Sequence, residues 1–122
     1  MHESLMLTTN GGKNAPVRVR AALEALNGGL DENNGDVRLL VSEIVTNAVV
    51  HAGVGRESFL RFGLAAGSDR IRAVLEYPGE PFTPRPKPEE QHFGLHLVES
   101  LSASWGVERD ADKNRVWFEI TR

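Results

Sequence analysis

The stretch Leu40–Ala52, with the sequence LVSEIVTNAVVHA, decides the fold expected for this chain. Apolar residues recur in and just before it at steps of three and four, which is typical of a helix with one face against a core. That face consists of Val37, Leu40, Val41, Ile44, Val45, Ala48 and Ala52. Asn33, Asn34 or Asp36 can cap the start of the helix, and Gly53 can end it. We therefore predict a long amphipathic helix packed on the rest of the chain.

Three polar side chains form a second stripe on the same helix. Glu43, Asn47 and His51 are four residues apart, so regular helical spacing places a carboxylate, a carboxamide and an imidazole beside the apolar face. A ligand held over the helix would explain them. The alternatives are a solvated Glu43 and a buried Asn47 whose hydrogen bonds are satisfied within the protein.

Composition limits the classes of protein to consider. The 122 residues are 40% hydrophobic and 25% charged, which is ordinary for one globular domain spanning 1–122. A net charge of −3 argues against direct binding of nucleic acid. No apolar run is long enough to span a membrane, no secretory signal is visible at the start, and cysteine is absent. These features predict a cytoplasmic protein without a membrane partner.

The remaining periodic segments predict an α/β fold of the α+β kind. We expect a two-layer sandwich, in which one mostly antiparallel mixed sheet of about five strands carries three helices on one face. Asn14 should cap the first helix, and Leu97, Val98 and Leu101 should point the last helix at the core. The predicted strands and flanking helices are 4–8, 14–26, 59–64, 70–77, 94–101, a strand that begins with Trp105 and Val107, and 116–121.

A proline-rich segment interrupts this pattern. Five of the six prolines lie between Pro78 and Pro88, which excludes a helix or an inner strand there. A loop of this length, residues 78–93, is either a lid over a ligand or a plain solvent loop. Just after it, His92 and His96 are four apart and could clamp a metal such as zinc, but no third ligand is obvious.

The polar stripe resembles a known motif. Glu43-x-x-x-Asn47-Ala48-x-x-His51 is similar to the N box of the GHKL (histidine kinase-like) ATPases, and its wording is closest to the anti-sigma regulatory factor branch, the small serine kinases of bacterial partner switching. The resemblance extends from about Leu5 to Ile120 and implies a Bergerat-type ATPase fold that binds ATP and magnesium. It implies that Asn47 coordinates the magnesium, that Glu43 acts as general base or orients the attacking group, and that His51 also lies at the nucleotide.

A second motif is consistent with this resemblance. The segment His92–Val98 is similar to the family's G2 box, Gly-x-Gly-Leu-x-Leu-Val, and Gly94 and Leu95 match it. His92 stands where the first glycine is expected and could contact a phosphate. Free N–H groups at the start of a helix favour phosphate oxygens, so this segment is the expected phosphate site.

The third motif is degenerate. The family's G1 box, Asp-x-Gly-x-Gly, reads the amine of adenine, and here it corresponds to Tyr77-Pro78-Gly79-Glu80-Pro81, which keeps only Gly79. Arg115 stands where the family tends to place a threonine of the same adenine network. Strand alternation points Glu76 to the other face. We therefore expect Tyr77 and Arg115 to stack on each other and fill the pocket.

Two functions follow from the resemblance, and the sequence leaves both open. The first is an ATP-dependent serine kinase using Mg-ATP, which binds a sigma factor or phosphorylates an anti-anti-sigma factor. The second is a non-catalytic pseudo-ATPase that binds a protein partner and has lost nucleotide binding. A homodimer is a further expectation that the resemblance alone supplies.

Overall fold

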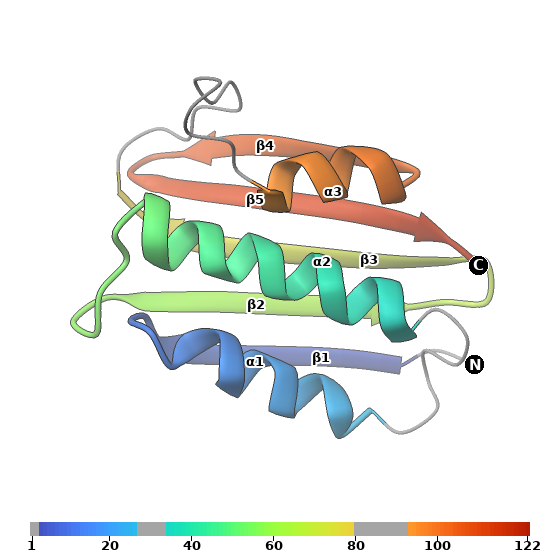
Figure 1. Ribbon diagram of the computed structural model, residues 1–122, viewed down its shortest axis with the longest axis horizontal. Coiled ribbons are helices and arrows are strands. Elements are labelled where there is room, and N and C mark those ends of the chain that lie inside the picture. The colour runs from blue at the N-terminus through green and yellow to red at the C-terminus, as the bar shows by residue number, and fades with distance from the viewer. Residues whose placement is uncertain (1–2, 27–33, 80–92) are drawn as a thin grey trace.

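A computed structural model describes residues 3–26, 34–79 and 93–122 of the chain (Figure 1). They form one sheet with the helices on one of its faces, which confirms the predicted two-layer α+β fold. The elements are β1 (Glu3–Asn10), α1 (Ala15–Glu24), α2 (Asn34–Thr46), the π-helical turn η2 (Asn47–His51), β2 (Phe59–Ala66), β3 (Arg70–Pro78), α3 (Phe93–Leu101), β4 (Ser104–Asp110) and β5 (Lys113–Thr121).

The five strands lie in the order β1-β2-β3-β5-β4. Every pair of neighbouring strands in the described sheet is antiparallel, so the prediction of a mixed sheet was wrong in that respect. Short hairpins join β2 to β3 and β4 to β5, which explains those antiparallel pairs. The second hairpin turns over Ala111, whose φ of +55° is unusual for a residue other than glycine.

The two central strands alternate as the sequence predicts. Along β3 and β5, every second side chain is buried beneath the helices, and those between them are half-buried on the open face. Leu75 pairs with Val116 and Ala73 with Phe118, so the buried residues of both strands share one face. This register decides which side chains reach the helix-covered side.

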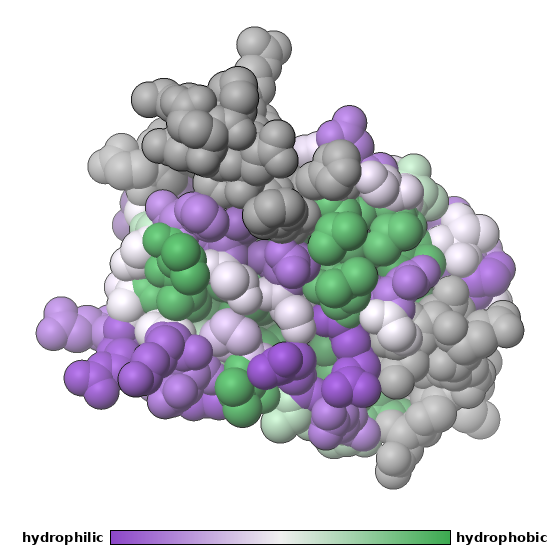
Figure 2. Space-filling model, viewed as in Figure 1, coloured by the Kyte–Doolittle hydropathy of each residue, from purple (hydrophilic) through white to green (hydrophobic). Residues whose placement is uncertain are grey.

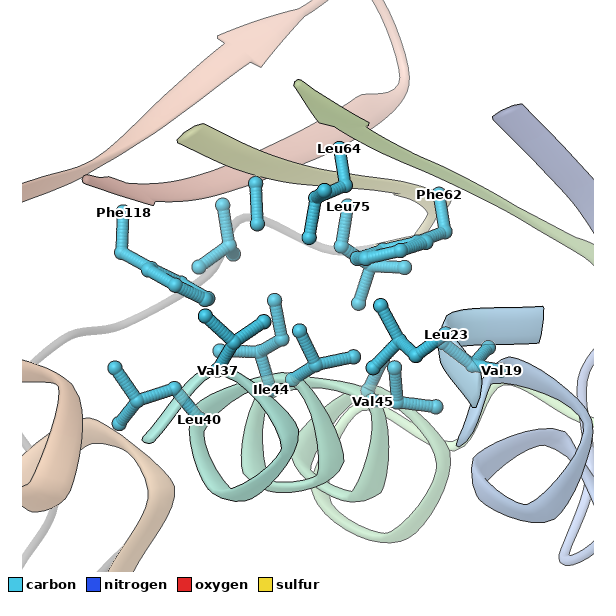
Figure 3. Close-up of a cluster of buried hydrophobic side chains, with 14 of the residues drawn as sticks. Val19, Leu23, Val37, Leu40, Ile44, Val45, Phe62, Leu64, Leu75 and Phe118 are labelled. Carbon is cyan, nitrogen blue, oxygen red and sulfur yellow. The ribbon is translucent and has the colours of Figure 1, made fainter. Parts of the chain in front are cut away.

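The apolar face of α2 forms the centre of the core. Figure 3 shows its valine, leucine and isoleucine side chains pointing at Phe62, Leu64, Leu75 and Phe118 from the sheet. Burying one side chain of this size contributes about 1.5–3 kcal/mol. The predicted face is confirmed except at Ala52, which is exposed because it follows the π-helical turn. The buried members from α2 and η2 are Val37, Leu40, Val41, Ile44, Val45 and Ala48.

The flanking helices cover the rest of the sheet. In α1, Ala15, Val19 and Leu23 are buried. The predicted capping bond of Asn14 is wrong, because this residue occupies the N-cap position but its side chain makes no capping hydrogen bond. In α3, Val98 is fully buried, whereas Leu101 is 39% exposed. The prediction that Leu101 faces the core was wrong, because α3 ends there beside the edge strand β4.

Two groups of predictions fall outside this description. The cap at Asn33 and the proline-rich loop with its lid role, including His92, lie mostly or wholly outside the described residues. Within the described parts of the chain, none of the helices combines the length and the apolar character needed to cross a membrane.

Candidate functional site

Most of the residues that the motifs singled out gather at one end of the sheet. In Figure 1, the green end of α2 and η2 lies over the end where β3 finishes, the β4–β5 hairpin turns and α3 begins. Across the strands, Tyr77 pairs with Asn114, and the Arg109 guanidinium donates a hydrogen bond to the Gly79 carbonyl oxygen at 2.5 Å. The fold thus brings together segments that are distant in sequence.

Asn47 carries an unpaired polar atom inside this end of the molecule. The residue is only 8% exposed, and its Nδ2 has no hydrogen-bond partner in the described part of the structure. Leaving such a donor unpaired costs about 1–3 kcal/mol. The alternative of a buried Asn47 with all its hydrogen bonds satisfied does not hold. An amide kept at this cost is suited to donate to an oxygen of a ligand.

The backbone changes from α to π geometry at the same residue. The Ala52 N–H donates to the Asn47 carbonyl oxygen at 3.1 Å, five residues back. Such single π-helical turns are rare and occur frequently at functional sites. Thr46 still has helical angles, so Glu43 and Asn47 are one α-helical turn apart and lie on the same side.

Glu43 and His51 occupy different surroundings around Asn47. Glu43 is half-buried on α2, one turn before the amide. His51 is exposed at the end of η2. The α-helical turn from Glu43 to Asn47 agrees with the predicted stripe, and the place of His51 in that stripe, across the π-helical turn, stays a prediction.

Tyr77 is buried on the helix-covered face at the end of β3. It is 2% exposed, and this burial raises the pKa of its phenol to about 12. A tyrosine hydroxyl keeps its proton at neutral pH in any case, and the raised pKa extends this range to higher pH. The aromatic ring belongs to the core, in the place where the family motif has an aspartate.

Arg115 does not stack on Tyr77, and that prediction was wrong. It lies opposite Glu76 on the open face of the sheet, and its Nε donates to Glu76 Oε2 at 2.9 Å. A second carboxylate, that of Glu108, accepts from Arg115 Nη1 at 3.3 Å. Hydrogen bonds to these two carboxylates, Glu76 first, raise the pKa of the guanidinium further above its usual range. A role for Arg115 in a pocket beneath the helices therefore has no geometric basis.

Asn114, and not its neighbour Arg115, lies on the helix-covered face at the start of β5. It is 1% exposed, on the helix-covered face beside Tyr77, and its Oδ1 accepts a hydrogen bond from Arg109 Nη1 at 3.2 Å. We missed both residues, although one signal was available. Counting back from Phe118 in steps of two reaches Asn114, so strict strand alternation places it inside.

The glycines of the G1-like and G2-like segments lie at the ends of secondary-structure elements. Gly79 has a φ of +133°, which favours glycine, and its N–H donates to the Asp112 carbonyl oxygen at 3.1 Å. Gly94 and Leu95 lie in the first turn of α3, whose N–H groups are suited to phosphate oxygens. The roles of these residues in binding a nucleotide stay predictions.

The donor set fits magnesium bound together with phosphates. No group of three or more His, Cys, Asp or Glu residues in the described segments could hold a metal by itself. Magnesium, however, keeps several waters and takes few protein ligands when it binds with phosphate oxygens. The Asn47 carboxamide can supply one oxygen to the metal and its unpaired Nδ2 one hydrogen bond to a phosphate.

The outer surfaces differ from this site. On the helix side, Figure 2 shows separate apolar areas among charged ones, and the exposed apolar side chains there are scattered over α1, α2, η2 and α3. Two hollows of about 480 and 460 Å³ lie on the open face, lined mainly by residues of β1, β2 and β3. Both include Arg61 and Glu76, and neither includes Glu43 or Asn47.

Comparisons with known proteins identify the fold. A crystal structure of the RsbU and RsbW domains of Rv1364c from Mycobacterium tuberculosis matches with a TM-score of 0.69 and 23% identity, over 98% of this chain and 32% of that one. The histidine kinase domain of the blue-light activated histidine kinase EL346 from Erythrobacter litoralis matches with a TM-score of 0.53 and 24% identity, over 86% of this chain and 58% of that one. This chain thus spans about a third and somewhat over half of these two relatives.

Sequence comparison gives the family itself. No curated protein sequence matches the chain. The model of one protein family, described as the histidine kinase-like ATPase domain, matches residues 13–120. This range includes α2, η2, the end of β3, α3 and the β4–β5 hairpin, which together form the candidate site. The chain therefore belongs to the family of histidine kinase-like ATPase domains.

Proposed function

We propose that this chain is a cytoplasmic regulatory protein of the anti-sigma type, which binds a magnesium–nucleoside triphosphate and acts on a protein partner. One observation carries the nucleotide part of the proposal. Asn47, at the start of a π-helical turn, keeps a buried Nδ2 without a partner in the described structure. A fold selected only for packing would gain stability by replacing this amide, so its presence favours a ligand at that point.

The residues around Asn47 suggest how a triphosphate would be held. Asn47 would ligate magnesium through Oδ1 and donate to a phosphate oxygen through Nδ2. The N–H groups in the first turn of α3, at Gly94 and Leu95, would bind further phosphate oxygens. Bound magnesium would neutralise charge on the phosphates and favour transfer of the terminal group. ATP is the nucleotide that the family name implies.

Glu43 is our candidate for the catalytic base. It lies one helical turn before Asn47 and is half-buried, so its carboxylate can accept the proton of a serine hydroxyl brought in by a partner. The proposed partner is a sigma factor or an anti-anti-sigma factor. This part follows the RsbW-like fold and the N-box resemblance, and it makes the chain a candidate serine kinase.

The first test compares ATP with inorganic triphosphate, which has the phosphates of the nucleotide but no nucleobase. Calorimetric titration with inorganic triphosphate and with ATP, with and without magnesium, should show magnesium-dependent binding. Asn47→Ala should weaken it about 10- to 100-fold, the effect of losing a hydrogen bond to a charged group together with a metal ligand. Asn14→Ala is the matched control, because Asn14 is exposed and makes no capping bond. Absence of heat and of thermal shift with both ligands would overturn the proposal.

A second candidate function rests on Tyr77. Its buried ring occupies the place where the family reads adenine, which favours a partner-binding module that has lost the nucleotide. For this module, the same titration should show no binding, while a mixture with the partner forms a complex whether or not ATP and magnesium are present.

A further inference from the structure

Three polar residues form a line across the sheet at the candidate site. Tyr77, Asn114 and Arg109, here called the polar row, come from the adjacent strands β3, β5 and β4. Tyr77 pairs with Asn114 in one ladder, and Asn114 pairs with Arg109 in the next. Strand alternation places all three side chains on the helix-covered face of the sheet. The hydrogen bond between Arg109 and buried Asn114 agrees with this placement.

The polar row offers hydrogen-bond donors and a positive charge. Arg109 can only donate, and its Nη1 already bridges Asn114 Oδ1 and the Gly79 carbonyl oxygen, at 3.2 and 2.5 Å. The bridge fixes the guanidinium beside the end of β3. The phenol of Tyr77 is protonated at neutral pH, as any tyrosine is. None of the three residues is a carboxylate.

This chemistry does not suit adenine. The exocyclic group of adenine is an amine, which needs an acceptor, and a negatively charged acceptor serves it best. Guanine and hypoxanthine instead present a carbonyl oxygen, O6, and the acceptor N7 on the same edge. A forked arginine side chain donating to O6 and N7 is a common specific contact to guanine in nucleic-acid complexes.

We propose that the polar row makes this site selective for a nucleotide whose purine carries an oxo group at C6, guanine or hypoxanthine, over adenine. The inference rests on the proposed function, because it takes the nucleotide to lie over η2 with its base toward the end of β3. Arg109 is the main specificity residue, because it is the exposed member of the polar row, whereas Tyr77 is buried in the core. The proposed phosphate contacts and the altered base contacts would then serve one ligand.

The test compares three nucleotides on the same protein. Calorimetric titration with magnesium and GTP, ITP or ATP should show GTP and ITP binding about 10- to 100-fold more tightly than ATP, the range for one good bidentate contact. ITP has the C6 oxo group of GTP but lacks its 2-amino group, so its affinity shows which of the two groups the site recognises. Inorganic triphosphate gives the affinity that owes nothing to the base.

Two variants assign the selectivity to Arg109. Arg109→Ala should remove the preference, so that GTP and ITP bind this variant no more tightly than ATP does. Arg109→Lys keeps the positive charge but loses the fork, so it should lose most of the preference as well. Arg20→Ala, an exposed arginine on α1, is the matched control. Thermal melting of each variant shows whether the fold is intact.

The outcomes separate the two proposals. Equal binding of the three nucleotides, or tighter binding of ATP, would overturn the selectivity and leave the proposed function standing. A GTP preference that survives in Arg109→Ala would overturn the role of the polar row. If triphosphate and all nucleotides fail to bind, the proposed function fails, and the selectivity fails with it.

Discussion

At the end of β3 and the start of β5, residues that are adjacent in sequence lie on opposite faces of the sheet and in different surroundings. On the helix-covered face, Tyr77 and Asn114 are buried side by side. On the open face, the adjacent Glu76 and Arg115 form an ion pair at the same rung of the ladder. Residues next to each other in sequence thus belong to different surfaces, and a site drawn from sequence alignment alone can include a residue that faces away from it.

The faces also differ in how they satisfy polar groups. Several charges on the described open face are paired, since Arg70 and Arg72 bond to Glu119 and Arg72 also lies 4.4 Å from the ring centroid of Trp117. The helix-covered side instead contains the buried amide of Asn47 with an unpaired Nδ2. Paired surface charges stabilise a fold modestly, whereas an unpaired buried donor destabilises it. The contrast favours the proposal that a ligand binds beside Asn47 on the helix-covered side.

The largest expected effect comes from truncating neighbouring aromatic residues on the two faces. Phe118 is fully buried, so Phe118→Ala should lower the free energy of unfolding by about 3–5 kcal/mol. Trp117, the next residue, is half-buried on the open face, and Trp117→Ala should cost at most about 2 kcal/mol. Urea unfolding of both variants measures the difference. Equal losses would mean that the open face is packed as tightly as the core.

The next effect is the part of the pH dependence of the free energy of unfolding that comes from Tyr77, measured as the difference from Tyr77→Phe. Well below pH 10 the phenol is protonated in both the folded and the unfolded chain, so the free energy of unfolding does not depend on its titration. Between pH 10.0 and about 12 the unfolded chain ionises while the folded one does not, so the free energy of unfolding falls. At the upper end we expect a loss of about 2 kcal/mol relative to Tyr77→Phe.

The measurement for Tyr77 is direct, because it is the chain's single tyrosine. Ultraviolet absorbance of the phenolate reports its titration in the folded protein, and unfolding of the wild type and Tyr77→Phe across the same pH range gives the stability difference. Phenolate formation near pH 10 in the folded protein would contradict burial of the hydroxyl.

A smaller effect distinguishes the two buried asparagines. Asn114 bonds to Arg109, so Asn114→Ala should destabilise the protein by about 1 kcal/mol. Asn47→Ala removes an unpaired donor, so its unfolding free energy without ligand should stay within about 1 kcal/mol of the wild type. Thermal and urea unfolding in ligand-free buffer test the pair. A larger loss for Asn47 than for Asn114 would show that Asn47 is structural.

The smallest effect concerns the charges of the open face. Glu119→Gln removes the ion pairs to Arg70 and Arg72, both of which are partly exposed to solvent. We expect a loss below about 1 kcal/mol, which decreases further at high salt because exposed pairs are screened. Urea unfolding at low and high sodium chloride measures it. A loss that persists unchanged in salt would indicate a structural role for the pairs on this face.

Local patterns were enough to predict much of the fold. The apolar face of α2, the alternation of β3 and β5 and the stop at Gly53 follow from periodicity and from the freedom of glycine, which act within a few residues of one another. The same local spacing placed Glu43 and Asn47 one turn apart on one side of a helix. The N-box resemblance then led to the family that the comparisons show.

Tertiary structure decided what those patterns could not contain. The π-helical turn at Asn47 and its unpaired amide depend on what packs around the helix end, which no short window of sequence records. The position of Asn114 beneath the helices, with Arg115 outside, depends on strand register, and a shift of one residue exchanges the two faces. The polar row exists because β3, β5 and β4 are neighbours, an order that the chain reaches only when it folds.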